Sequence, residues 1–157
     1  MLPLLVHYHG GGFCIGSPFT SALKNFLSTL ATQANVIAIS IDYRLAPEHQ
    51  LPIAYDDSWA GLLWIAKHSN SNGPEPWINE YADLGRVILA GESAGGTIAH
   101  HVAVQAAGLA AVAIERLIIM YPKLNPAVDP NFSKFKCDKV LVCVAEKDNH
   151  RAKGEDH

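Results

Sequence analysis

One glycine-flanked serine constrains the fold of this chain more than any other feature. Ser93 lies in the hexapeptide GESAGG, which follows the apolar run RVILA and precedes the helix-like run TIAHHVAVQAA. A G-x-S-x-G pattern at such a junction is typical of a serine on a strained strand-to-helix turn, with its hydroxyl exposed. Small residues at Gly91 and Gly95 would let the flanking backbones pass closely. The pattern therefore predicts that Ser93 is a nucleophile at the start of a helix.

A second glycine-rich motif, HGGGF, follows the first apolar run of the chain. Successive glycines let the backbone curl so that N–H groups point into a site instead of pairing within a sheet. Such a loop completes an oxyanion hole, the set of N–H donors that stabilises a developing negative charge. The alternative, a flexible glycine turn beside an idle serine, is disfavoured because both motifs occur in this order after strand-like runs. We predict N–H donors at Gly11, Gly12 and Ala94, with His9 and Gly10 supporting the loop.

Short apolar runs alternate with longer runs that have helical spacing. The 157 residues are enough for one domain, residues 1–157, with a single buried core. The order β-α-β-α-β-α-β-β predicts an α/β fold with a mainly parallel sheet and helices on its faces. The last two strands have the apolar character of buried strands. Strands are expected over residues 2–9, 36–41, 86–90, 116–121 and 139–145, and helices over residues 21–34, 55–68 and 94–107.

Composition excludes several classes of partner and compartment. Apolar residues make up 49% and charged residues 17%, which is typical of a globular protein rather than a disordered one. The formal net charge of −3 offers no basic face for nucleic acid or an anionic membrane. No run approaches the roughly 20 apolar residues of a membrane span. Three cysteines without a C-x-x-C pair, and a start without a signal-peptide pattern, favour the cytoplasm.

Several longer motifs together resemble one known family. HGGGF, DYRLAPEH, AYDDSW and GESAGG are similar to the hormone-sensitive-lipase-like branch of the α/β-hydrolases, and most similar to plant carboxylesterases and 2-hydroxyisoflavanone dehydratases. The stretches GPEPWINEYADLGRV and KVLVCVAEKD strengthen the plant resemblance. The resemblance implies an α/β-hydrolase fold and hydrolysis of short carboxylic esters, small-molecule substrates, through an acyl-enzyme. It implies neither a metal nor an organic cofactor.

The resemblance also implies a catalytic triad. Ser93 would attack the ester, a histidine would take its proton, and an acid would orient that histidine. Asp148 in VAEKD matches the position of the acid, with Glu146 in the same turn as the alternative. His157 in the terminal GEDH matches the position of the base. His150, two residues after Asp148, is the less favoured candidate for the base.

The chain departs from the family pattern in ways that predict an incomplete fold. Compared with the family, we expect it to lack the N-terminal strands, the cap over the site and the last strand. Only eight residues separate Asp148 from His157, too few for a crossover between parallel strands, which takes about a dozen. A sheet without its outer strands has exposed edges, which leaves self-association through those edges open.

Two alternative functions follow from the same motifs. The chain could be a catalytically inactive remnant or a binding module similar to gibberellin receptors, which share the fold without the catalytic histidine. It could also have the dehydratase activity found within the family. Other polar residues have structural interpretations: Asp42, Arg44 and Glu48 as stabilisers of the loop after residues 36–41, and His100 and His101 as ordinary helix residues.

Overall fold

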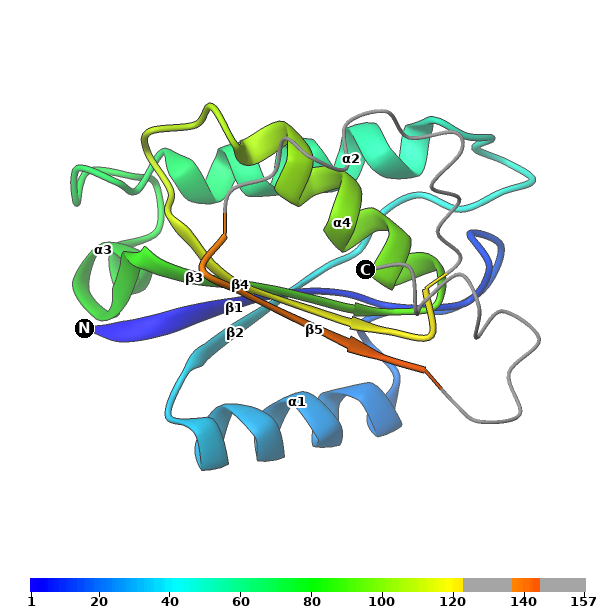
Figure 1. Ribbon diagram of the computed structural model, residues 1–157, viewed down its shortest axis with the longest axis horizontal. Coiled ribbons are helices and arrows are strands. Elements are labelled where there is room, and N and C mark those ends of the chain that lie inside the picture. Colours follow the sequence, from blue (N-terminus) through cyan, green and yellow to red (C-terminus); the bar gives the residue numbers. More distant parts are fainter. Residues whose placement is uncertain (123–136, 145–157) are drawn as a thin grey trace.

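The computed structural model describes residues 1–122 and 137–144, which form one parallel sheet with helices on both faces (Figure 1). The strands pair in the order β2-β1-β3-β4-β5, and every pairing is parallel, as the sequence predicts. The elements are β1 (Leu2–Tyr8), α1 (Ser21–Ala34), β2 (Ile37–Ile41), α2 (Ile53–Ala66), α3 (Pro76–Tyr81), β3 (Ala82–Glu92), α4 (Ala94–Ala106), β4 (Ile114–Met120) and β5 (Lys139–Cys143).

The order of the predicted elements is confirmed, and two differences stand out. A short helix, α3, occupies a segment for which no element is predicted, and Pro76 is its first residue. Proline favours this position because its missing N–H would have no helical partner there. The chain then enters β3 directly, so that this strand begins at Ala82 rather than at Arg86. β3 is thereby the longest strand described, and its carboxyl end leads to Ser93.

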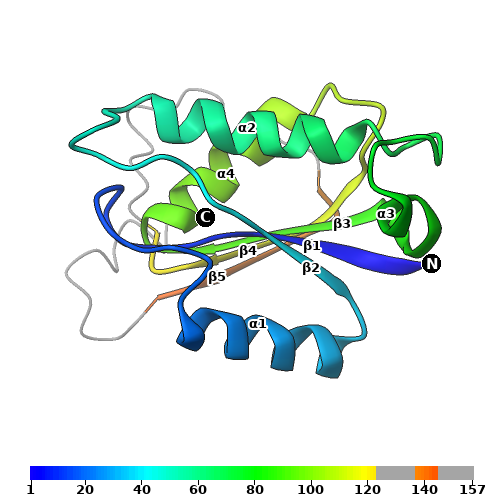
Figure 2. The ribbon, with the colours of Figure 1, turned by 180° about the vertical axis from the view of Figure 1, so that it is seen from behind.

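The helices divide between the two faces of the sheet. Figures 1 and 2 show α2 and α4 on one face and α1 on the other. Side chains along β1 alternate between these faces, as the period of a strand requires. Leu4, Val6 and Tyr8 belong to the core beneath α2 and α4, whereas Leu5 packs with Leu27 of α1. The sheet therefore separates two cores of unequal size.

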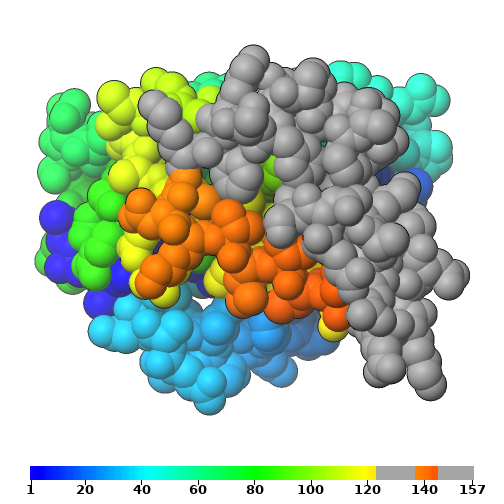
Figure 3. Space-filling view, viewed as in Figure 1, coloured from blue at the N-terminus to red at the C-terminus, as the bar shows by residue number. Residues whose placement is uncertain are grey.

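β5 corrects one expectation. The sequence predicts a buried strand, but Val140 is 43% exposed and Leu141 is 54% exposed. The reason is position: β5 pairs only with β4 among the described residues, so it forms an edge of the sheet there. Figure 3 shows it at the molecular surface, coloured orange beside α1.

Within the described ranges, no helix is both long and apolar enough to cross a bilayer.

Candidate active site

Ser93 occupies the turn between β3 and α4 in a conformation that few residues adopt. Its backbone has φ 52° and ψ −117°, and a positive φ is uncommon for a residue other than glycine. The Ser93 N–H donates to the carbonyl of Met120 at 2.7 Å, which ties the turn to the end of β4. Strain of this kind persists only where the surrounding structure holds it, and such positions cluster at functional sites.

Three glycines allow the backbones around this turn to approach closely. A side chain at Gly91 would overlap the carbonyl of Gly95, and one at Gly95 would overlap the carbonyl of Tyr8. At Gly96 a Cβ would lie 2.9 Å from a side-chain carbon of Ile119. The first turn of α4 is therefore pressed against the carboxyl ends of β1 and β3. This agrees with the prediction that small residues at Gly91 and Gly95 let the flanking backbones pass closely.

The HGGGF segment forms a compact loop after β1. Gly11 and Gly12 have φ values of 122° and 63°, which side chains disfavour. The carbonyl of Gly11 accepts the N–H groups of Cys14 and Ile15, both at 3.1 Å, so the loop curls back on itself. The carbonyl of Phe13 accepts the Ala46 N–H at 2.8 Å, which joins the loop to the segment after β2. These contacts hold the loop in a defined shape.

His9 supports this loop from within the core, where its side chain is buried. Its Nδ1–H donates to the carbonyl of Gly10 at 2.7 Å, and its ring stacks on Tyr43 with 4.3 Å between centroids. The Tyr43 hydroxyl donates to the His9 carbonyl at 2.5 Å. Burial, and to a lesser extent the charge of Glu92, raises the pKa of Tyr43, so its hydroxyl remains a donor. His9 and Tyr43 thus fix the base of the loop.

The loop and the serine turn leave adjacent strands at the same edge of the sheet. Tyr8 and Gly91 are paired residues of β1 and β3, so both segments emerge side by side at the carboxyl ends. Ala94 is the first residue of α4, and an N–H in that position has no partner inside its own helix. The partial positive charge of the helix N-terminus lies at the same place. Such an arrangement can stabilise an anion beside a serine hydroxyl.

Comparison with known proteins agrees with this geometry. The family described as alpha/beta hydrolase fold matches residues 5–134. This chain belongs to the α/β-hydrolase family. Over 191 aligned residues it is 38% identical to a protein named probable carboxylesterase 5 of Arabidopsis thaliana, covering 94% of this chain and 60% of that protein. It is 44% identical over 108 residues to a 2-hydroxyisoflavanone dehydratase of Glycine max, covering 67% of this chain and 34% of that protein.

Solved structures show the same similarity. A hyperthermophilic esterase from the archaeon Pyrobaculum calidifontis superposes with a TM-score of 0.67 at 32% identity. The match covers 82% of this α/β-hydrolase chain and 38% of the archaeal esterase. The chain thus spans less than two thirds of the length of each of these three relatives.

Two of the three predicted triad residues lie outside the described residues of this α/β-hydrolase. Asp148, His157 and the alternatives Glu146 and His150 all fall within residues 145–157, which are not described. Their catalytic roles remain predictions from the family pattern. Within residues 1–122 and 137–144, no three His, Cys, Asp or Glu side chains come together as metal ligands would.

The segment after β2 is fastened by an ion pair, as the charge pattern predicts for Arg44. Its guanidinium donates to both carboxylate oxygens of Asp57 on α2, each at 2.8 Å, and its N–H donates to the same carboxylate at 3.0 Å. Phe13 of the HGGGF loop (residues 9–13, the candidate oxyanion loop, hereafter the oxyanion loop) also packs on Tyr55 of α2, which in turn contacts the ring of His101 on α4. The loop is thereby connected to both helices on this face, and His101 has the packing role expected of a helix residue.

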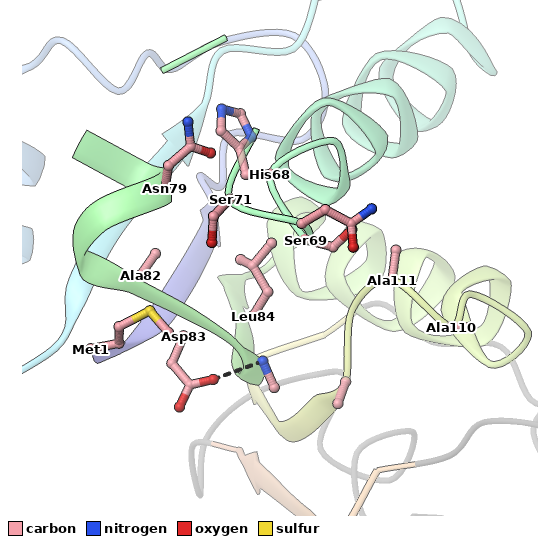
Figure 4. Close-up of a pocket in the computed structure, with 13 residues that line it drawn as sticks. Met1, His68, Ser69, Ser71, Asn79, Ala82, Asp83, Leu84, Ala110 and Ala111 are labelled. Atoms are coloured by element: carbon pink, nitrogen blue, oxygen red, sulfur yellow. Dashed lines mark hydrogen bonds between the residues drawn. The ribbon is translucent and has the colours of Figure 1, made fainter. Parts of the chain in front are cut away.

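Figure 4 shows a pocket lined by the first residues of β3, whereas Ser93 follows the last residue of that strand. It has a volume of about 480 Å³ and lies beside the first residues of β1 and β3, with Met1, His68, Asn79 and Asp83 in its lining. In open α/β sheets, ligands bind outside the carboxyl ends of the strands. This pocket is at the amino ends, so we assign no catalytic role to it in this α/β-hydrolase.

Glu92 and His7 are two polar residues near Ser93 to which no sequence motif assigns a role. Glu92 immediately precedes the serine, and its carboxylate accepts the N–H of Gly10 at 2.8 Å and a ring N–H of His7 at 3.0 Å. No local pattern distinguishes these residues, because the contact joins segments 82 and 85 residues apart in the chain. In this α/β-hydrolase, a partly buried polar network thus lies next to the candidate nucleophile.

Proposed function

We propose that this chain carries the nucleophile and oxyanion hole of a serine carboxylesterase that acts on short carboxylic esters. One observation carries the proposal: Ser93 has a positive φ at the start of α4, and the loop with Gly11 and Gly12 follows β1, the strand adjacent to β3. In our proposal, N–H groups from this loop and from the start of α4 act together as oxyanion donors beside the serine, which suits attack on an ester carbonyl. The names of the relatives, a probable carboxylesterase and an esterase, support the same reaction class.

The reaction would proceed in two halves. The Ser93 hydroxyl attacks the carbonyl carbon of the ester while a histidine, His157 by the family pattern, takes its proton. The oxyanion so formed is held by the N–H groups of Gly11, Gly12 and Ala94. Collapse releases the alcohol, which takes the proton from the histidine, and leaves an acyl group on Ser93. Water then attacks the acyl carbon while the histidine takes its proton; the bond to Ser93 Oγ breaks, Ser93 regains the proton from the histidine, and the carboxylic acid leaves. Asp148 orients the histidine in both halves.

The first test is hydrolysis of p-nitrophenyl acetate and p-nitrophenyl butyrate by the purified chain. We expect turnover that falls to the buffer rate in Ser93→Ala and in His157→Ala, because each removes one member of a unit that acts together. Ser28→Ala, a substitution at an exposed position of α1, is the matched control and should keep full activity. If the folded protein shows no turnover, the proposed function is wrong.

A serine-directed fluorophosphonate probe tests the nucleophile separately. We expect one covalent label per chain, lost in Ser93→Ala and kept in Ser28→Ala. Labelling that persists in Ser93→Ala would place the reactive serine elsewhere. The inactive-remnant and receptor-like hypotheses predict no labelling of Ser93, so the probe distinguishes them from the esterase.

The cytoplasm is the compartment that we propose. Cys14, Cys137 and Cys143 are all free thiols in the structure, which suits a reducing environment. Alkylation of the protein isolated without reductant should modify all three cysteines. Oxidised thiols in freshly isolated protein would argue for another compartment.

A further inference from the structure

The carboxylate of Glu92 connects the two halves of the candidate site. Its Oε1 accepts the N–H of Gly10 at 2.8 Å, and its Oε2 accepts from Nε2 of His7 at 3.0 Å. Glu92 is the residue before Ser93, and Gly10 is the residue before the first predicted oxyanion donor, Gly11. One carboxylate therefore spans from the neighbour of the nucleophile to the neighbour of the N–H donors.

His7 holds the other oxygen of this carboxylate from inside the sheet. The His7 side chain is 1% exposed, and its Nδ1 lies 3.2 Å from the hydroxyl of Ser40 on β2. His7 pairs with Ser40 on one side, and its own neighbour on β3 is Ala90, two residues before Glu92. The contacts thus cross three adjacent strands, and the ring cannot turn away without losing partners on both sides.

The charge of Glu92 decides which way these hydrogen bonds run. Partial burial alone would raise the pKa of Glu92, but the hydrogen bonds from His7 and the Gly10 N–H outweigh it, and the pKa lies below its ordinary value. The side chain is therefore an ionised carboxylate at neutral pH, which only accepts. His7 must carry its proton on Nε2, and both hydrogen bonds are charge-assisted, the stronger kind.

We propose that Glu92 is a positioning residue that sets the oxyanion loop relative to Ser93, and that His7 orients its carboxylate. The kinetic consequence rests on the proposed esterase function. Glu92 touches no reacting atom in this scheme and acts through the Gly10 N–H. Because a misplacement of 1 Å in a catalytic group can cost about 10²-fold in rate, a rigid link of this kind matters for turnover.

The surroundings of Glu92 make it suitable for substitution. Its side chain is 34% exposed and borders a cavity of about 310 Å³ between the loop and α1, beside Thr20, Leu23 and Phe26. Removing the carboxylate would leave a space open to solvent rather than an empty void in the core. We therefore expect Glu92→Ala to fold, so that its effect on the loop can be measured.

β3 itself offers a matched control at its other end. The carboxylate of Asp83 accepts a backbone N–H, from Gly85 at 2.9 Å, and a side-chain donor, Arg86 at 2.7 Å. Glu92 makes the same pair of hydrogen bonds at the end that leads to Ser93. Asp83→Asn thus weakens an equivalent carboxylate on the same strand, away from the site.

The kinetic test compares these variants with p-nitrophenyl butyrate as substrate. We expect Glu92→Ala to lower kcat by about 10²-fold, with KM changed by less than about threefold, because the link acts on the transition state. Glu92→Gln keeps one acceptor for Gly10 and should lose about 10-fold in kcat. Asp83→Asn should leave both constants unchanged. A fall in kcat no larger in Glu92→Ala than in Asp83→Asn overturns the proposal.

Two variants of His7 test its part by rescue. His7→Leu introduces an apolar side chain of similar size and removes the ring donor. We expect it to lower kcat as Glu92→Gln does. His7→Gln restores an N–H donor and should recover most of that loss. Equal activity of the Leu and Gln variants would show that His7 does not act by orienting the carboxylate.

A measurement without turnover separates this proposal from the proposed function. In NMR hydrogen exchange of the full chain, the amide of Gly10 should be protected and should exchange at least about 10-fold faster in Glu92→Ala, since its acceptor is gone. Exchange at Gly10 that does not change overturns the positioning role, whether or not the protein hydrolyses esters. Faster exchange with an unaltered kcat in an active protein overturns the kinetic consequence.

Discussion

The two faces of the sheet differ sharply in how they are covered. Among the described residues, nineteen buried apolar side chains form the core under α2 and α4, whereas four form the core under α1. The face with α1 instead carries the His7–Glu92 pair at the carboxyl ends of the strands. Apolar burial is the main favourable contribution to folding, so the α2–α4 face holds the fold together. The polar network beside Ser93 lies on the α1 face, where polar side chains take the place of fewer apolar contacts.

The largest effect is expected at the contact between α4 and the sheet. Gly95→Val would place a branched side chain onto the carbonyl of Tyr8, and neither backbone can move without disturbing β1 or α4. We expect a loss of about 4 kcal/mol or more in the free energy of unfolding, or no folded protein. Urea unfolding monitored by circular dichroism measures it.

Gly108→Ala is the control for this substitution, because a Cβ there meets no atom within 4 Å. Its free energy of unfolding should stay within about 0.5 kcal/mol of the wild type. If Gly95→Val were as stable as Gly108→Ala, the close packing of α4 against β1 at Gly95 would be contradicted.

The two cores can be compared by one leucine from each. Leu89 of β3 is fully buried under α2 and α4, and Leu27 of α1 is 8% exposed in the smaller core. We expect Leu89→Ala to cost about 4 kcal/mol and Leu27→Ala about 2 kcal/mol in the free energy of unfolding, because the smaller core leaves less of a cavity. Equal losses in urea unfolding would contradict the difference between the faces.

The smallest effect concerns the ion pair that fastens the segment after β2. Hydrogen bonds from Arg44 hold the pKa of Asp57 below its ordinary value, against a smaller opposing effect of burial. Its contribution to stability is therefore complete above the unfolded pKa, near 4, and is lost as the pH falls through the lower folded pKa. Since Arg44 is 54% exposed, Asp57→Asn should cost less than about 1 kcal/mol at pH 7.

Thermal unfolding at several pH values checks this pair. The difference in melting temperature between the wild type and Asp57→Asn should shrink as the pH is lowered below about 4, where the wild-type carboxylate takes up its proton. A difference that stayed constant down to pH 2 would mean that the charge of Asp57 contributes nothing.

Local patterns were enough to predict the elements that position the site. The spacing of Gly91, Ser93 and Gly95 predicts a tight turn because the steric requirement is confined to five residues. The parallel order of the strands follows from the alternation of strands and helices. These features depend on neighbours in the chain, so the sequence carries them directly.

Other features depend on contacts that no local pattern contains. The exposure of Leu141 follows from the place of β5 at the edge of the described sheet, which an apolar run does not specify. The role inferred for Glu92 depends on Gly10, 82 residues away. The partner of Arg44 is Asp57, which lies on a different element. In each case the topology of the sheet, rather than the residue itself, decides the environment.

The pairing of β1 with β3 also has a consequence for how the protein folds. His7 and Glu92 are 85 residues apart in the chain, and the contact between them requires the whole α1-β2-α2-α3 segment to be looped out. Closing a long loop costs entropy before its contacts are made, and folds dominated by such pairings form slowly. We therefore expect the oxyanion loop and the serine turn to meet only late in folding, so that no short fragment of the nascent chain can hold both in place.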